Sequence, residues 1–305
     1  MVHVILRNFF LFLSKNQLLN HSARKWGLKL GASQVVAGET ISQAIKVVRQ
    51  LNEKGLICTV DHLGEFVQTK EEAIQSTNYC IRTLNAITKT GVNCNLSLKL
   101  TQLGLDVDKQ LCYENLKNIL STAKRHNIFV RIDMENFVHC QPTLELLEEL
   151  RKDYNGLVGT AIQAYLYRAI DDVNNLKGVN LRLVKGAYRE SAKAAYQKKE
   201  EIDANFLKII KQHLRNGSYT AVATHDHMII QNVKEFCKQE QIAKSQFEFQ
   251  MLYGFRTDLQ EEIAKEGYTM RVYVPYGNDW FGYFMRRLAE RPQNVSFALR
   301  GLFSR

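Results

Sequence analysis

Short apolar runs that alternate with longer helical patterns are the feature of this sequence that most limits its fold. Eight runs rich in β-branched and apolar residues recur along the chain, each followed by a helical pattern. The runs span residues 56–62, 94–100, 128–135, 157–165, 179–186, 219–227, 247–254 and 268–277. Such alternation predicts a parallel sheet with right-handed crossovers. Eight units in about 250 residues match the size of a (β/α)8 barrel of the TIM type.

The segments between the runs carry apolar residues at three- and four-residue spacing, the period of an amphipathic helix. Gly91 is expected to end the first of these helices and Pro142 to begin the third. No G-x-G-x-x-G follows the first run, which reads "TVDHLGEF", so a doubly wound nucleotide-binding sheet is disfavoured. The predicted helices span 71–91, 109–127, 142–156, 196–217, 228–241 and 257–267, with a last one inside 276–291.

We expect an N-terminal helical extension over residues 1–55 and a barrel over residues 56–305. The first 20 residues form an apolar stretch that Arg7 interrupts, without a small-residue cleavage site. We interpret it as a retained amphipathic helix that either packs on one end of the barrel or contacts a membrane surface. No apolar run reaches 18 residues, so no membrane-spanning helix is expected.

Charge and cysteine content narrow the class of protein. The net charge of +10 would suit anionic lipid or nucleic acid, but the basic residues are interspersed with acidic ones. We therefore expect a solvated basic surface and no nucleic-acid partner. The six cysteines show no C-x-x-C spacing, which indicates reduced thiols in the cytoplasm rather than disulfides or a zinc site.

Polar and charged residues gather where the predicted strands end, which is where a (β/α)8 barrel builds its active site. Charges inside apolar strands are costly unless they are paired or functional. Any one of them could belong to a structural ion pair, but together they predict an active site. The set comprises Asp61, His62, Glu65, Lys99, Asp133, Met134, Glu135, Gln163, Arg182, Lys185, Thr224, His225, Asp226, His227, Gln250, Tyr273 and Tyr276.

Two motifs in this set suggest particular chemistry. In "LRLVKGAY", Gly186 and Ala187 let backbone N–H groups approach a phosphate or a planar ring, and a fixed cation would stabilise a reduced flavin. A phosphorylated sugar would suit the same motif. In "ATHDH", His225 and His227 could bind a metal, or a neutral His225 could hydrogen-bond to a cofactor. A lysine Schiff base at Lys99 or Lys185 and a non-catalytic basic protein are the remaining alternatives.

Taken in order, the motifs resemble those of the proline dehydrogenase family. They are "SLKL", "RIDME", "IQAYL", "LRLVKGAY", "ATHD", "EFQMLYG" and "RVYVPYGNDWFGYFMRRLAERPQN", within residues 57–300. The resemblance implies a distorted barrel that binds FAD non-covalently. It also implies oxidation of L-proline to 1-pyrroline-5-carboxylate, the first step of proline catabolism, by hydride transfer to FAD N5. Electrons would then pass to a membrane quinone. No aldehyde dehydrogenase-like half follows, so we expect the monofunctional bacterial form, cytoplasmic and in transient contact with the inner face of the cell membrane.

The resemblance also implies roles for individual residues. Asp133 would be a catalytic residue that organises the substrate site, and Arg182 would lie beside flavin N5. Family members often have tryptophan where this chain has Arg189. The resemblance therefore does not define how the adenosine side of the cofactor packs. No metal site is implied. The substrate site would contain Lys99, Leu252, Tyr273, Tyr283, Arg286 and Arg287, and the cofactor site Met134, Gln163, Arg182, Lys185, Gly186, Ala187, Thr224 and His225.

The pattern "YGNDWFGYFMRRLAER" predicts a C-terminal helix that covers the substrate at the barrel mouth. Neighbouring helical residues point about 100° apart, so Arg286 and Arg287 cannot share one solvent-facing stripe by amphipathicity alone. We expect both to bind the proline carboxylate, with Glu290 one turn away as a brace. Tyr283 is expected to face the substrate, whereas Phe281 and Phe284 pack the helix down.

Overall fold

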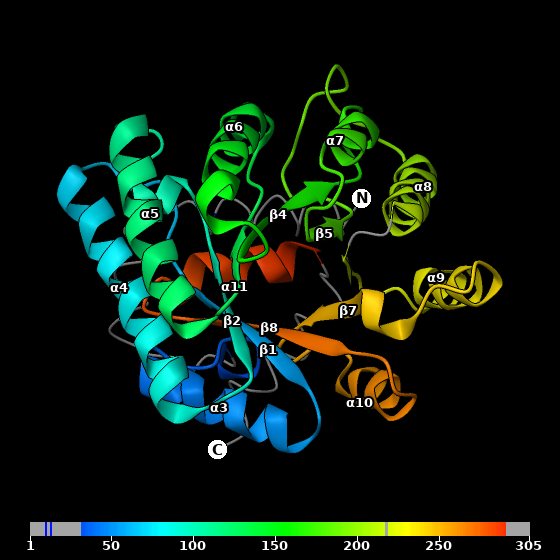
Figure 1. Ribbon diagram of the computed structural model, residues 1–305, viewed down its shortest axis with the longest axis horizontal. Coiled ribbons are helices and arrows are strands. Elements are labelled where there is room, and N and C mark those ends of the chain that lie inside the picture. Colours follow the sequence, from blue (N-terminus) through cyan, green and yellow to red (C-terminus); the bar gives the residue numbers. More distant parts are fainter. Residues whose placement is uncertain (1–9, 11–12, 14–31, 217–218, 291–305) are drawn as a thin grey trace.

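Eight parallel strands form a closed barrel in the order of the sequence (Figure 1). The computed structural model describes residues 10, 13, 32–216 and 219–290. The predicted (β/α)8 fold is confirmed, and each observed strand lies inside one predicted run. The strands are β1 Ile57–His62, β2 Cys94–Leu98, β3 Val130–Ile132, β4 Val158–Gln163, β5 Leu181–Val184, β6 Thr220–Ala223, β7 Phe247–Leu252 and β8 Met270–Tyr276.

Helices surround the barrel as an outer ring (Figure 1). They are α3 Ile41–Glu53, α4 Lys70–Thr90, α5 Lys109–His126, α6 Phe137–Tyr154, α7 Ala169–Asn175, α8 Lys199–Arg215, α9 His227–Gln239, α10 Thr257–Lys265 and α11 Trp280–Glu290. Short 3-10 turns occur at η2 Ala32–Gln34, η3 Thr101–Leu103 and η4 Lys244–Gln246. No helix in the described ranges is long and apolar enough to cross a bilayer.

Local capping explains where α4 begins and ends. The side chain of Thr69 accepts a hydrogen bond from the backbone N–H of Glu72, which satisfies one of the free N–H groups of the first turn. At the other end Gly91 adopts a left-handed conformation with φ 66°, as the sequence predicted. The helix is therefore bounded by two residues whose chemistry favours those positions.

Two helices differ from the prediction. We expected Pro142 to begin α6, but this was wrong, because the helix already begins at Phe137. Pro142 is the sixth residue of the helix, and because it has no N–H it leaves the carbonyl of Val138 without its intrahelical hydrogen bond. The seven-residue helix α7 was not predicted, because it is too short to show a clear helical period.

Helix α3, before the barrel, and helix α11, after it, lie in different places relative to the ring of helices. Helix α3 packs against β1 and β8, so it fills the place in the ring where a helix after β8 would otherwise stand. Residues before β1 are also tied to β8 through the backbone, since the N–H of Ala37 donates to the carbonyl of Pro275. Part of the predicted extension is thus integrated into the barrel. Helix α11 instead crosses the centre of the ring in Figure 1.

A small apolar cluster fixes α11 in this position. Trp280 is fully buried, and Phe284 is buried beside Leu63 of the loop after β1. Phe281 packs against the same cluster while partly exposed. The prediction that Phe281 and Phe284 pack the helix down is therefore confirmed. The main core lies between the outer faces of the strands and the ring of helices, including Leu96, Ile132 and Leu183.

Candidate active site

Polar side chains fill the barrel interior near the C-terminal ends of the strands. Successive residues of a barrel strand point alternately inward and outward. The inward positions therefore bring together Asp61 of β1, Ser97 of β2, Arg182 of β5 and Gln250 of β7, each at most 5% exposed. Lys99, Asp133 and Tyr273 join them through hydrogen bonds and ion pairs. Sequence reasoning identified all of these residues except Ser97.

Asp133 is the centre of this interior network. Its Oδ1 accepts a hydrogen bond from the Ser97 hydroxyl at 2.9 Å and forms an ion pair with Arg182. Its Oδ2 accepts a hydrogen bond from the Tyr273 hydroxyl at 2.6 Å. Burial acts to raise the pKa of Asp133, but the charges of Arg182 and Lys99 and these hydrogen bonds hold it below its usual range. The carboxylate is thus held ionised.

The guanidinium of Arg182 is oriented by several partners in addition to Asp133. Its Nε donates to Gln250 Oε1 at 2.7 Å and its Nη2 donates to the Ser97 hydroxyl at 3.1 Å. The guanidinium carbon also lies 5.0 Å from the centre of the Tyr273 ring, within cation–π distance. A planar group with this many fixed donors presents its positive charge in one direction.

Lys99 lies between two buried carboxylates, Asp61 and Asp133, whose pKa values are shifted in opposite directions. Its Nζ is 2.8 Å from Asp61 Oδ2 and 3.7 Å from Asp133 Oδ2. Burial acts to lower the pKa of Lys99. The negative charges of three carboxylates have the larger effect and raise this pKa above its ordinary value; they belong to Asp61, Asp133 and Glu65. Burial raises the pKa of Asp61 despite the opposing charge of Lys99. A lysine held charged in this way disfavours the Schiff-base alternative, which needs a neutral amine.

A second polar layer lies deeper in the barrel and supports the first. Glu248 forms an ion pair with Arg271 at 2.8 Å and accepts hydrogen bonds from Tyr219 at 2.9 Å and from Gln250 Nε2 at 2.5 Å. Gln250 therefore links this layer to Arg182. Sequence reasoning missed Glu248 and Arg271, although each precedes a predicted residue by two positions on the same strand, the spacing of one strand face.

Most of the residues expected to hold a cofactor lie on three neighbouring strands or directly after them, and Met134 follows a fourth, β3. Strands β4, β5 and β6 pair side by side, which brings Gln163 and Thr224 to one edge of the barrel. Gln163 is 3% exposed and donates from Nε2 to the carbonyl of Glu135 at 2.7 Å. The ring nitrogen Nε2 of His225 accepts a hydrogen bond from the N–H of Leu252 at 3.1 Å. Met134, in the loop after β3, is also buried.

The Lys185–Gly186–Ala187 segment leaves β5 with its backbone exposed at Gly186 and Ala187. Gly186 has φ 118°, and a Cβ there would lie 2.2 Å from the ring of Tyr165, so this position requires glycine. Lys185 lies against α8 and α9, where its Nζ is 2.5 Å from Asp203 and 3.1 Å from Asp226. It is therefore neutralised by two carboxylates on the outer side of the strand.

Helix α11 places Arg286 beside the loop after β1. Its Nη2 donates to Glu65 Oε1 at 3.1 Å, with 34% of the Arg286 side chain exposed. Sequence reasoning proposed Glu290 as a brace, but the side chains of Arg287 and Glu290 lie outside the described residues. Tyr283 is 7% exposed within the apolar cluster under α11, and its expected contact with substrate remains a prediction.

Two further residues of the predicted set, besides Lys185, point away from the interior. The Tyr276 hydroxyl hydrogen-bonds to the Thr83 hydroxyl of α4 at 2.5 Å, and His62 stacks on Tyr79 with 4.4 Å between ring centres. Both follow an inward-facing residue by an odd number of positions, so the strand pleat turns them outward. Among the residues that the structure describes, no group of three or more His, Cys, Asp or Glu is arranged to hold a metal.

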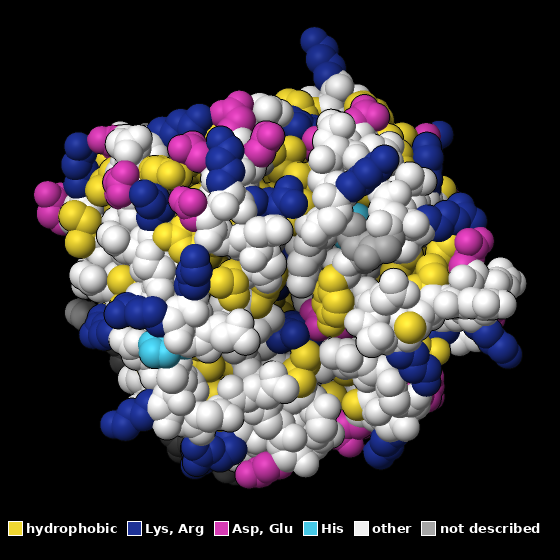
Figure 2. Space-filling view, in the orientation of Figure 1, with side chains coloured by type: hydrophobic (Ala, Val, Ile, Leu, Met, Phe, Trp, Pro, Cys, Tyr) yellow, Lys and Arg dark blue, Asp and Glu magenta, His cyan; other side chains and the backbone are white. Residues whose placement is uncertain are grey.

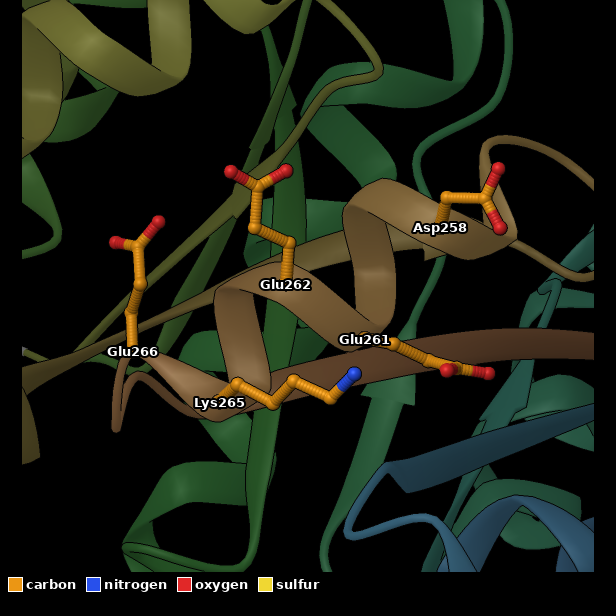
Figure 3. A pocket seen from close by; sticks show the side chains of 5 residues that line it. All are labelled: Asp258, Glu261, Glu262, Lys265 and Glu266. Carbon is orange, nitrogen blue, oxygen red and sulfur yellow. The ribbon is translucent and has the colours of Figure 1, made fainter.

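A separate shallow pocket lies on the outer layer. It has a volume of about 430 Å³ and is lined by five residues of α10 and its C-terminal end, four of them acidic (Figure 3). The face in Figure 2 shows Lys and Arg around its whole outline with Asp and Glu between them, as the sequence predicted. Because the α10 pocket is acidic and holds none of the interior residues, it does not suit a carboxylate substrate.

Comparison with known proteins assigns the family. The sequence profile described as proline dehydrogenase matches residues 44–300. The chain is 52% identical to proline dehydrogenase 2 of Bacillus subtilis over 301 residues, covering 98% of this chain and 99% of that protein. It is 39% identical to proline dehydrogenase of Deinococcus radiodurans over 310 residues, covering 99% of both chains.

Solved structures agree with this assignment. Proline utilization A from Bdellovibrio bacteriovorus, inactivated by N-propargylglycine, superposes with a TM-score of 0.81 at 28% identity. That comparison covers 90% of this chain and 34% of the solved chain, so the present chain spans about a third of its length. Since both the profile and full-length relatives match, this chain belongs to the proline dehydrogenase family.

Proposed function

We propose that the chain oxidises L-proline to 1-pyrroline-5-carboxylate, with FAD as the hydride acceptor and a membrane quinone as the electron acceptor. Family membership supports proline dehydrogenase activity in proline catabolism. The observation that carries the finer proposal is the buried network in which Asp133 holds Arg182 and Tyr273 beside a charged Lys99. This network places fixed positive charge next to an aromatic side chain at the active-site end of the barrel.

The charged groups suit a small zwitterion such as proline. A carboxylate needs cationic donors, and an arginine can supply two parallel hydrogen bonds. We infer that Lys99, Arg286 and Arg287 bind the carboxylate. Arg286 already binds one carboxylate, that of Glu65, and its side chain is exposed enough to accept another. Tyr273, Tyr283 and half-buried Leu252 would supply the walls for the ring methylenes.

The strand ends β4, β5 and β6 suit an extended dinucleotide. Gly186 keeps the segment tight against Tyr165, so that the exposed backbone of Gly186 and Ala187 is available to a planar ring or a phosphate. FAD, when bound, would accept the hydride from the ring carbon next to the proline nitrogen. Residues proposed to hold it are Met134, Gln163, Arg182, Lys185, Gly186, Ala187, Thr224 and His225.

The protein's own residues orient the reactants and fix charge. Arg182 would supply a positive charge that stabilises the negative charge of a reduced flavin ring when FAD is bound. Asp133 keeps Arg182 and Tyr273 in place through its two oxygens, so we infer that it organises the site without accepting a proton, since its pKa is held low. The positive charge of Lys99 attracts the substrate carboxylate and so favours its binding in the site over its hydration in solvent. These contributions are positioning and electrostatics.

Exposed apolar side chains near the mouth support the proposed membrane contact. Phe66, Phe137, Val138 and Tyr167 are among the exposed large hydrophobic residues, and Val138 is 70% exposed. They belong to the loop after β1, the start of α6 and the loop after β4, all at the C-terminal ends of the strands. Two of these segments are in contact, since the ring centre of Phe66 lies 6.1 Å from that of His139 in α6.

Basic residues adjoin these apolar side chains. Residues 185–199 after β5 hold five Lys or Arg against one Glu, and Arg189, Lys193 and Lys198 are exposed. The carboxylate of Glu190 in this segment accepts a hydrogen bond from the N–H of Phe137, which joins it to α6. Apolar side chains beside basic ones suit the surface of an anionic bilayer, where a quinone resides. The predicted contact through residues 1–20 lies outside the described residues.

A visible spectrum tests the core of the proposal. The purified protein should absorb near ~450 nm if it carries a flavin, and anaerobic L-proline should bleach that band. D-Proline at the same concentration is the control, because a stereospecific site should not oxidise it. A colourless protein, or a flavin band that L-proline leaves unchanged, would refute the assignment of cofactor and substrate together.

A further inference from the structure

Glu135 is a buried acidic residue that the proposed chemistry does not use. It lies two positions after Asp133, in the loop after β3, and is 1% exposed. Its Oε1 accepts a hydrogen bond from the backbone N–H of Thr101 at 3.1 Å, and its Oε2 accepts one from the Thr101 hydroxyl at 2.5 Å. Thr101 begins η3, two positions after Lys99. The carboxylate therefore holds the turn that follows the substrate-side lysine.

The backbone of Glu135 makes a second connection on its other side. Its carbonyl oxygen accepts a hydrogen bond from Gln163 Nε2 at 2.7 Å. Gln163 ends β4 and belongs to the residues proposed to hold the cofactor. One residue thus joins the strand that carries the substrate lysine to the strand that carries a cofactor ligand.

A carboxylate is an expensive choice for this position if holding a turn is its only role. Burying a charge without a directly bonded cation costs free energy, whereas a neutral glutamine could accept the same backbone hydrogen bond. Within the described ranges Glu135 forms no ion pair, since both of its side-chain oxygens bond to Thr101. The acidic group therefore indicates a use for its charge or its proton.

We propose that Glu135 is a positioning residue that sets the geometry and the electrostatic strength of Lys99: its carboxyl group holds the Lys99 turn, and its charge state tunes how strongly that lysine attracts a substrate carboxylate. The proposal deepens the function above and rests on it, because it takes Lys99 as a carboxylate-binding residue. When Glu135 is ionised, its negative charge opposes an incoming carboxylate. When it is protonated, that opposition is absent.

The surroundings of Glu135 place its ionisation in the working range of pH. Burial raises the pKa of Glu135 to about 7, against the hydrogen bonds from Thr101 that lower it. Glu65, in the loop after β1, contributes to the rise and Lys99 opposes it. Cys112 of α5 and Tyr188 of the loop after β5 also face it, and burial keeps both of these neutral by raising their pKa values. Glu135 therefore changes charge over this pH range while Cys112 and Tyr188 stay neutral.

The test is binding of cyclopentanecarboxylate, a proline analogue without the ring nitrogen, to the holoenzyme. Its single carboxylate stays ionised from about pH 6 to about pH 8.5, well above an ordinary carboxyl pKa. Isothermal titration calorimetry should show its affinity falling severalfold as pH rises through this range. In Glu135→Gln the affinity should stay near the wild-type value at low pH and hardly change with pH, while FAD stays bound because the Gln163 contact is to the backbone.

Two further variants separate this role from a merely structural one. In Thr101→Val, loss of the hydroxyl hydrogen bond removes an influence that lowers the pKa of Glu135, so the midpoint of the affinity change should move to higher pH. In Glu65→Gln the change with pH should persist. An unaltered pH dependence in both Glu135→Gln and Thr101→Val would overturn the proposal. Absence of proline oxidation by the wild-type enzyme would instead overturn the function on which it rests.

Discussion

The two aspartates that flank Lys99 should contribute to stability very differently. Asp133 accepts hydrogen bonds from Ser97 and Tyr273 and pairs with Arg182, which is 5% exposed. Among the described residues, Lys99 is the one charged group that pairs with Asp61, and the Oδ1 of Asp61 has no hydrogen-bond partner. The substitutions Asp133→Asn and Asp61→Asn remove the same charge at similar burial, so each serves as the matched control for the other.

The expected magnitudes follow from the partners left behind. Asp133→Asn leaves Arg182 without its ion pair in the interior, and removing one partner of a buried pair costs about 3–5 kcal/mol. Asp61→Asn leaves Lys99 with Asp133 at 3.7 Å. It also removes a carboxylate whose charge is disfavoured by burial, as its raised pKa shows. The net loss should then be about 1 kcal/mol or less, the size of one ordinary hydrogen bond.

Urea unfolding followed by circular dichroism measures both values at neutral pH. An Asp61→Asn variant that loses as much stability as Asp133→Asn would refute the reasoning, because it would show that proximity to Lys99, not the full set of partners, decides the cost. Asp153→Asn, on the exposed surface of α6, controls for the loss of one negative charge. It should leave stability nearly unchanged.

The pH dependence should differ in sign between the two aspartates. The folded-state pKa of Asp133 is depressed, so its stabilisation is complete above the unfolded value of about 4 and is lost as pH falls through the folded value. The stability difference between wild type and Asp133→Asn should shrink below that pH. The folded-state pKa of Asp61 is raised, so its ionisation destabilises the fold as pH rises above about 4. Asp61→Asn should therefore gain relative stability over that range.

Further predictions concern the substrate and cofactor residues. Arg286→Met should raise KM for proline at least tenfold, the equivalent of about 1.4 kcal/mol, while the ~450 nm band is retained; an unchanged KM in steady-state assays would contradict its role as a carboxylate ligand. Arg182→Met should slow flavin reduction in stopped-flow measurements, and a change in proline affinity alone would argue against a place beside the flavin. Gly186→Ala should lose bound FAD and about 1–3 kcal/mol of stability, because its Cβ would meet the Tyr165 ring at φ 118°. If this variant kept both its bound FAD and its stability, the chain around Gly186 would be able to move away from Tyr165.

Much of the fold could be predicted because its signals are local. Each strand of the barrel is a short apolar run that is visible in the sequence, and α4 ends at the glycine that was expected to cap it. The start of α6 could not be predicted from Pro142, because it depends on where β3 ends and how the chain turns after it. The polar residues at strand ends could be predicted as a set, because the barrel topology requires those ends to meet at one face.

The partners within the site could not be predicted in the same way. The sequence by itself determined that Lys99, Asp133, Arg182 and Tyr273 would share one end of a barrel, because their positions follow from the strand pattern. Only the tertiary structure decided that Asp133 binds three of these neighbours, that Asp61 pairs with Lys99, and that Arg286 meets Glu65 more than 200 residues away. Pairings of this kind depend on strand register, burial and the position of α11, which are set when distant segments pack together and not by the residues adjacent in the chain.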